Sequence, residues 1–425
     1  MSASTSRSYG RGAAILSAGI GVTGVITFGY FALASHSLPE SEYGHITLLW
    51  SAVFITVSVL YRPVEQLLSR TIADRDARGL TGNDHLRVAA TIQLGLAAVF
   101  LVGALALREP IEDQLLGNSS ALYKILIVAV LAYAASYFAR GFLAGHHRFG
   151  LYGGLVLMEA TSRFMFALAV AVGIASGQTA VALGIAAAPI VSLAVVPWAL
   201  GRRLRAQPAV TEADEAEGAF TLAHGGGFAI AVLLIMLSEQ TFLNAGPLLV
   251  KANAETGGAA LAGFTFNVLL IARAPLQLFQ AIQTSILPHL TRLRASGETD
   301  PFRRSVNVTL IAIAGFAGCV ALVMLAIGPW LMGVLFGGDF HYGRGGLVLV
   351  SIGMGLYLSA ATFNQALLAH GRARQSCAVW VVCAAGFALF LLLVDVNNRV
   401  LQVEAAYVGA AAALCGLLYL LYRRA

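Results

Sequence analysis

Apolar stretches long enough to cross a membrane recur from one end of this 425-residue chain to the other. Crossing the ~30 Å hydrocarbon core of a bilayer takes about 20 helical residues. No water meets the backbone there, so each stretch must satisfy its own hydrogen bonds as a helix. Charged residues make up only 11% of the chain, against about 25% in soluble proteins. The sequence therefore predicts a polytopic, all-α membrane protein.

We expect twelve transmembrane helices, at 12–34, 46–68, 86–107, 121–143, 150–174, 180–200, 222–248, 259–288, 306–327, 345–369, 375–394 and 401–422. The stretch 329–337 is too short to span, and we expect an amphipathic connection or an extension of the ninth helix. Ala32-Leu33-Ala34 resembles a signal-peptide cleavage site. The apolar run before it is longer than the core of a usual signal peptide, which favours an uncleaved first helix.

The basic residues indicate how the helices are oriented. With twelve spans, nineteen of the 27 Lys and Arg residues lie on the side of both termini. Five lie on the other side: Arg108, Lys124, Lys251, Arg344 and Arg399. Basic residues concentrate in cytoplasmic loops. We therefore expect both termini in the cytoplasm.

The longest polar linker, 201–219, divides the chain into two six-helix bundles, 1–200 and 220–425. The two halves share weak features in the same order. The second predicted helix contains Arg62-Pro63, and the eighth contains Arg273-Ala274-Pro275. An even number of spans keeps two such repeats parallel. We therefore expect a pseudo-two-fold axis along the membrane normal.

Four short motifs are spaced along nearly the whole chain: Leu38-Pro39-Glu40-Ser41-Glu42-Tyr43-Gly44, Arg140-Gly141-Phe142-Leu143-Ala144-Gly145, Glu255-Thr256-Gly257 with Arg273-Ala274-Pro275, and Gly328-Pro329-Trp330-Leu331. In these motifs and their order the chain resembles the multidrug/oligosaccharidyl-lipid/polysaccharide (MOP) exporter superfamily, and within it the polysaccharide transporter branch of O-antigen and lipid-linked oligosaccharide flippases. The resemblance implies a protein of the bacterial inner (plasma) membrane. In the lipid II flippase branch of the superfamily there are two more helices, and the first helix carries cavity cations. This chain has no predicted helices beyond the twelfth, and arginine is sparse in its first helix. These departures argue against lipid II as a substrate.

The resemblance implies two bundles facing each other as a V, with a central cavity that opens to either side in turn. It implies a flippase that moves a polyprenyl-diphosphate-linked oligosaccharide to the outer leaflet for cell-surface polysaccharide biosynthesis. The expected partners are this glycolipid, membrane lipids, and the glycan polymerase and glycosyltransferases of the same process. We expect no nucleic acid, because the basic residues form no single patch.

Three arginines in predicted spans are candidate cavity cations for an anionic headgroup. Charge at bilayer depth is costly and marks function by default, and a guanidinium can donate two hydrogen bonds to a diphosphate. The candidates are Arg273, Arg163 and Arg62. Each has an alternative reading. Arg273 can pair with an acid or a carbonyl and fix packing. Arg163 can pair with Glu159, four residues earlier. Arg62 can extend to the lipid headgroups beside Glu65.

Glu239 in the predicted seventh helix is a candidate for ion coupling. That span contains no basic residue that could neutralise it locally. A carboxylate of this kind can take up a proton or hold a cation during transport. The alternative is a neutral glutamate that bonds to a neighbouring helix.

Other classes of function fit less well. The chain has no Walker A sequence, no GxSxG and no HExxH, so we expect no enzyme, no cofactor and no metal site. A cation-coupled multidrug exporter of the same superfamily is the alternative function, although such a site would favour acids over arginines. A glycan polymerase or ligase is a third possibility, but the outer loops are short for catalysis.

Overall fold

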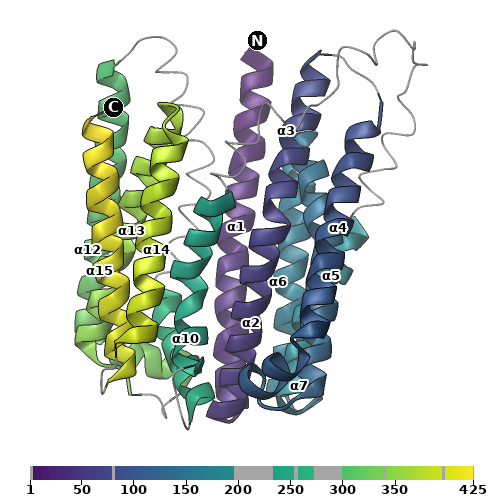
Figure 1. Cartoon of the computed structure of the whole chain (residues 1–425), viewed down its shortest axis with the longest axis vertical. Helices are drawn as coiled ribbons and strands as arrows, with labels where there is room; N and C mark the ends of the chain where they lie inside the picture. Colours follow the sequence, from purple (N-terminus) through teal and green to yellow (C-terminus); the bar gives the residue numbers. More distant parts are fainter. Residues whose placement is uncertain are drawn as a thin grey trace. The chain divides into compact units, whose positions relative to one another are not determined.

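The computed structural model describes residues 3–78, 82–195, 233–252, 257–271, 299–337, 341–394 and 398–424. Within these ranges the chain is helical with short connections and contains no β-strand (Figure 1). The linker 201–219 and the eighth predicted helix after residue 271 lie outside the described residues. The prediction of an all-α protein is confirmed.

The helices of the N-terminal half are α1 (Ala3–Ser37), α2 (Glu40–Leu60), α3 (Arg62–Arg78), α4 (Asp84–Ala106), η1 (Pro110–Leu115), α5 (Ser120–Gly145), α6 (Phe149–Ala171), α7 (Gly177–Ser192) and η2 (Leu193–Val195). Those of the C-terminal half are η4 (Thr241–Ala245), α10 (Gly246–Ala252), α12 (Thr299–Phe336), α13 (Arg344–Ala369), α14 (Ala373–Leu393) and α15 (Arg399–Arg423). A further apolar helix spans Gly258–Ile271.

Nine helical segments of the described chain are long and apolar enough to cross a membrane, and two shorter apolar helices accompany them. With α1, the described part has a helix at each of the twelve predicted positions. The ninth predicted helix continues through 329–337 as the end of α12, which was one of the two alternatives. The second predicted helix is two helices, α2 and α3. They meet at Tyr61, directly before Arg62-Pro63, because proline lacks the N–H that would continue the ladder.

The helix α4 shows how the apolar sequence is divided between protein and lipid. Its buried residues are Ala89, Gln93, Ala97 and Ala104, a narrow stripe of mostly small side chains. Leu94 and Val99 on the same helix are each 69% exposed. Small residues let membrane helices approach closely, whereas large exposed apolar side chains suit contact with acyl chains.

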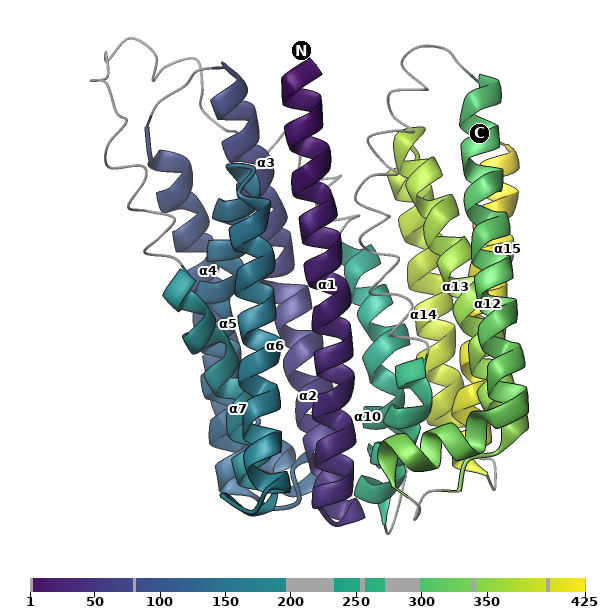
Figure 2. The same ribbon diagram turned by 180° about the vertical axis from the view of Figure 1, so that it is seen from behind.

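By its internal contacts the chain divides into two compact units. Unit 1 comprises 1–30 and 53–229, and unit 2 comprises 31–52 and 230–425. The end of α1 and the start of α2 therefore belong to unit 2. In unit 1, α5 contacts α3, α4, α6 and α7, and Figure 2 shows α5, α6 and α7 side by side. In unit 2, α13 contacts α12, α14 and α15.

Glycines set two of the closest helix approaches. A Cβ added at Gly141 of α5 would lie 2.8 Å from the carbonyl oxygen of Glu65 in α3. In unit 2, a Cβ at Gly44 of α2 would lie 1.9 Å from the carbonyl oxygen of Ala259. In both places backbone meets backbone, so only glycine fits without a shift of one helix.

Candidate functional site

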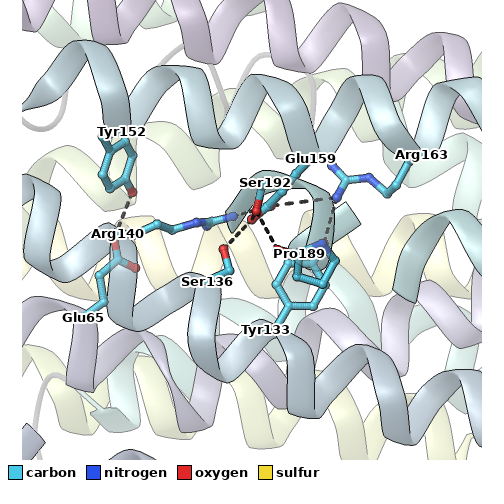
Figure 3. Close-up of polar contacts among 9 residues, drawn as sticks. All are labelled: Glu65, Tyr133, Ser136, Arg140, Tyr152, Glu159, Arg163, Pro189 and Ser192. Atoms are coloured by element: carbon cyan, nitrogen blue, oxygen red, sulfur yellow. Dashed lines mark hydrogen bonds and ion pairs between the residues drawn. The ribbon is translucent and has the colours of Figure 1, made fainter. Parts of the chain in front are cut away.

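The candidate site is a network of buried charged and polar side chains in unit 1 (Figure 3). Its centre is Glu159 in α6, which is 2% exposed. Its carboxylate accepts hydrogen bonds from Ser136 and Arg140 of α5 and, at 3.4 Å, from the hydroxyl of Ser192 at the end of α7. Three helices therefore converge on one acid.

A second arginine also faces this acid. Nη1 of Arg163 lies 4.0 Å from Oε2 of Glu159 and donates a 2.7 Å hydrogen bond to the hydroxyl of Tyr133 in α5. Figure 3 shows Glu159 between the guanidinium groups of Arg140 and Arg163. The pairing of Arg163 with Glu159, which their four-residue spacing allows, is thus present in the structure. Glu159 is not available to Arg163 alone, because the same carboxylate also pairs with Arg140.

The second acid of the network is Glu65 in α3, which is buried. It accepts a 2.8 Å hydrogen bond from the hydroxyl of Tyr152 in α6. Arg62 and Arg140 act electrostatically on the same carboxylate. The guanidinium of Arg140 also lies over the ring of Tyr137, 4.6 Å from its centroid. Arg140 therefore links the two acids of the network.

Local sequence explains why these side chains meet. Tyr133, Ser136, Tyr137 and Arg140 stand three and four residues apart on α5, so they share one face of that helix. The glycine at position 141 lets α3 approach this face of α5. Between α6 and α7, a Cβ at Gly184 would lie 3.1 Å from the carbonyl oxygen of Arg163, so this glycine keeps α7 close as well.

The network contains three arginines and two glutamates, which leaves one more positive than negative charge when all are ionised. The ionisable members are Arg62, Glu65, Arg140, Glu159 and Arg163. The Nε of Arg140 is buried, and no described residue accepts a hydrogen bond from it. A buried set of this kind is suited to an anion, because an additional negative charge would balance it.

The other predicted residues are placed as follows. Arg62 is half-buried at the junction of α2 and α3. Glu239 is half-buried in the span Leu233–Ala252 of unit 2, directly before Gln240 and the π-helix η4. Single π-turns of this kind are frequent at functional sites. Arg273 lies outside the described residues.

Sequence reasoning missed Arg140, which was counted among the basic residues of the cytoplasmic side. In the structure its side chain is 12% exposed and bound to Glu159. A signal was available, because Arg140 lies inside the apolar run 121–143 on the same helical face as Ser136 and Tyr133. Polar residues on one face of an apolar helix indicate a polar neighbour.

No family model matches the chain. Among curated proteins, an uncharacterized protein of Mycobacterium tuberculosis, Rv1510, is 26% identical over 379 residues, which covers 85% of this chain and 80% of the relative. This likeness extends over most of both proteins but assigns no activity.

Solved structures show the fold. An inward-facing multidrug resistance MATE transporter of the MOP superfamily matches with a TM-score of 0.66 and 12% identity, over 95% of this chain and 94% of the other. A variant of the Vibrio cholerae MATE transporter VcmN matches with 0.65 and 17% identity, over 98% of each chain. A MOP superfamily transporter from Pyrococcus furiosus, described as having a binding pocket of reverse polarity that suggests a different function, matches with 0.63 and 14% identity, over 97% and 95%. The chain thus has the fold of the MATE transporters.

Proposed function

We propose that this protein, a multi-pass membrane chain with the MATE fold, is a flippase. Its substrate would be a polyprenyl-diphosphate-linked oligosaccharide, moved from the cytoplasmic to the outer leaflet for cell-surface polysaccharide biosynthesis. The observation that carries the proposal is the buried network of unit 1, in which Arg62, Arg140 and Arg163 outnumber Glu65 and Glu159.

The physical argument concerns the cost of charge at bilayer depth. An arginine within a span is expensive unless an acid or a bound anion compensates it. Glu159 is shared between two arginines, so the set gains from one further negative charge. A diphosphate supplies that charge, and each guanidinium can bind it with two hydrogen bonds. Neutral or cationic cargo would add nothing to this balance.

In this mechanism Arg62, which is half-buried, contacts the diphosphate directly, and Arg273 stays a candidate contact from its place in the sequence. Arg163, held by Glu159 and Tyr133, contributes to the positive field. The polyprenyl tail stays in the lipid while the headgroup crosses the membrane by alternating access. Glycosyltransferases would supply the substrate and a glycan polymerase would consume it.

A cation-coupled multidrug exporter is the second candidate, and its support is the fold shared with multidrug MATE transporters. The polarity of the buried network favours the glycolipid instead. The Pyrococcus furiosus transporter, whose binding pocket of reverse polarity is described as suggesting a different function, has a similar fold.

Arg62→Gln provides the direct test of the proposal. In proteoliposomes loaded with a polyprenyl-diphosphate oligosaccharide, we expect translocation to fall about ten- to a hundredfold, because a hydrogen bond to a charged group contributes about 1.5–3 kcal/mol. Arg87→Gln is the matched control, since the Arg87 side chain is 84% exposed and pairs only with Asp84 among the described residues. Unchanged glycolipid translocation by Arg62→Gln, together with efflux of a cationic dye by the native protein, would favour the multidrug exporter.

We also propose that Glu239 couples transport to an ion. The Glu239→Gln variant should be present in the membrane in the same amount as the native protein. Under an imposed proton gradient it should lose the gradient-dependent part of translocation. Normal gradient-driven transport by this variant would remove Glu239 from the coupling step.

A further inference from the structure

A second site lies in unit 2, at the end where α1 turns into α2. A cavity of about 570 Å³ is lined there by residues at the starts of α2, α13 and α15 and by the helix Gly258–Ile271. Its size is within the range of pockets that hold small molecules or headgroups. Its location at helix ends corresponds to the headgroup depth of a bilayer rather than to the hydrocarbon core.

The main feature of this cavity is Glu404 of α15. This residue lines the cavity and is only 6% exposed. No described residue donates a hydrogen bond to its carboxylate or pairs with it. The carboxylate lies against Gly346 of α13, where an added Cβ would come within 2.1 Å of both oxygens. A buried carboxylate without a partner is costly. Gly346 leaves the space that the Glu404 carboxylate occupies, and a bound cationic group would supply the missing partner.

The remaining polar lining is also suited to a cation. Glu40 at the start of α2 and His341 line the same cavity, and no described lining residue is Lys or Arg. Phe264 and Leu401 supply apolar walls. Among the described residues no three His, Cys, Asp or Glu side chains lie close enough to hold a metal ion. An organic ammonium group, which needs only one or two acceptors, fits this lining better.

Two lining residues of the cavity are each followed in the chain by an arginine. Arg344 directly follows Gly343, and Arg399 directly follows Asn398, and both of these neighbours line the cavity. Gly343 and Asn398 are also the N-caps of α13 and α15. The first-turn amides of a helix carry partial positive charge and attract phosphate. Acids in the lining, together with helix N-termini and arginines next to lining residues in the chain, suit a zwitterion.

We propose that this cavity binds the headgroup of a phosphatidylethanolamine lipid. The ammonium group lies against Glu404 and Glu40, and the phosphate lies at the edge near Arg344 and Arg399. The acyl chains remain in the bilayer. This site is separate from the network of unit 1, and its occupancy does not depend on which cargo the protein transports.

The test is a titration of the delipidated, purified full chain, followed by native mass spectrometry. The probes are dioleoyl-phosphatidylethanolamine and dioleoyl-phosphatidylglycerol, which share the phosphate and the acyl chains and differ in the ammonium group. We expect the native protein to bind the ethanolamine lipid about tenfold more tightly. Glu404→Gln keeps the shape of the side chain and should abolish this preference. Equal affinity of the native protein for both lipids, or an unchanged preference in Glu404→Gln, would overturn the proposal.

Three further measurements keep the result interpretable. Glu109→Gln, at an exposed acid of unit 1, should bind both lipids as the native protein does. If Glu404→Gln fails to fold, Glu40→Gln must reduce the preference instead, and a full preference there contradicts the site. Soluble phosphoethanolamine should bind far more weakly than the lipid. Equal binding of the soluble compound would show that the ligand is not a lipid.

Discussion

Glu159 is the residue on which the buried network of unit 1 depends. It accepts hydrogen bonds from Ser136 and Arg140 and faces Arg163 at 4.0 Å. Removing one partner of a buried ion pair leaves the other charge uncompensated, which costs more than the pair itself contributes. Here the loss of one acid would expose two arginines to each other at close range.

Glu159→Gln should therefore destabilise the protein by about 3–5 kcal/mol, the usual cost of breaking a buried pair. The measurement is the midpoint of chemical or thermal unfolding in a fixed detergent. Glu112→Gln is the control, because it breaks the pair with Arg108, whose side chain is 58% exposed, and should leave the midpoint unchanged. If both variants unfold at the native midpoint, the ion pairs of Glu159 do not stabilise unit 1.

At the scale of the element, the approach of α3 to α5 brings the two acids of the network close to one arginine. Gly141 of α5 makes this approach possible, since any side chain there would meet the backbone of Glu65 at 2.8 Å. Gly145, one turn later, lies against Ile72 of α3, where an added Cβ would come within 2.6 Å of the Ile72 Cβ. A row of glycines on one helix thus decides which residues of the next helix it contacts.

Gly141→Ala should separate α3 from α5 and lower stability, since overpacking a well-packed contact costs about 1–3 kcal/mol. Gly95→Ala of α4 is the matched control, because nothing lies within 4 Å of a Cβ added there. Alanine favours a helix by about 1 kcal/mol over glycine, so the control should be as stable as the native protein or more so. A midpoint for Gly141→Ala equal to that of the control would contradict the close contact.

At the scale of the whole molecule, the distribution of basic residues predicts the orientation in the membrane. With the predicted spans, nineteen basic residues lie on the side of the two termini, whereas the other side has Arg108, Lys124, Lys251, Arg344 and Arg399. Loops rich in Lys and Arg stay in the cytoplasm. Both termini are therefore expected there.

Reporter fusions check this orientation. Green fluorescent protein fused after residue 424 should fluoresce, and alkaline phosphatase inserted at Gly117, in the turn between η1 and α5, should be active. Phosphatase activity from a fusion at the C-terminus would reverse the predicted topology. An exposed loop is used for the insertion so that helix packing is not disturbed.

The transmembrane helices could be predicted from the sequence because the constraint that produces them is local. In a bilayer each apolar segment must satisfy its own backbone, so length and hydropathy are enough. The i,i+4 pair of Glu159 and Arg163 was also predictable, because both residues lie on one helix. A kink in the second helix was also predictable, because Pro63 removes a backbone donor, and the structure divides this helix at Tyr61.

The partners that a residue finds on other helices were decided only by the tertiary structure. Arg140 was counted with the loop residues, yet it lies between Glu159 and Glu65, because Gly141 brings α3 and α5 together. Nothing in the sequence marks Glu404 as a site residue, since its burial in a cavity depends on how α15 packs on α13. Hydropathy identifies a helix but not its rotation about its own axis. That rotation, set by close contacts between neighbours, determines which charges meet.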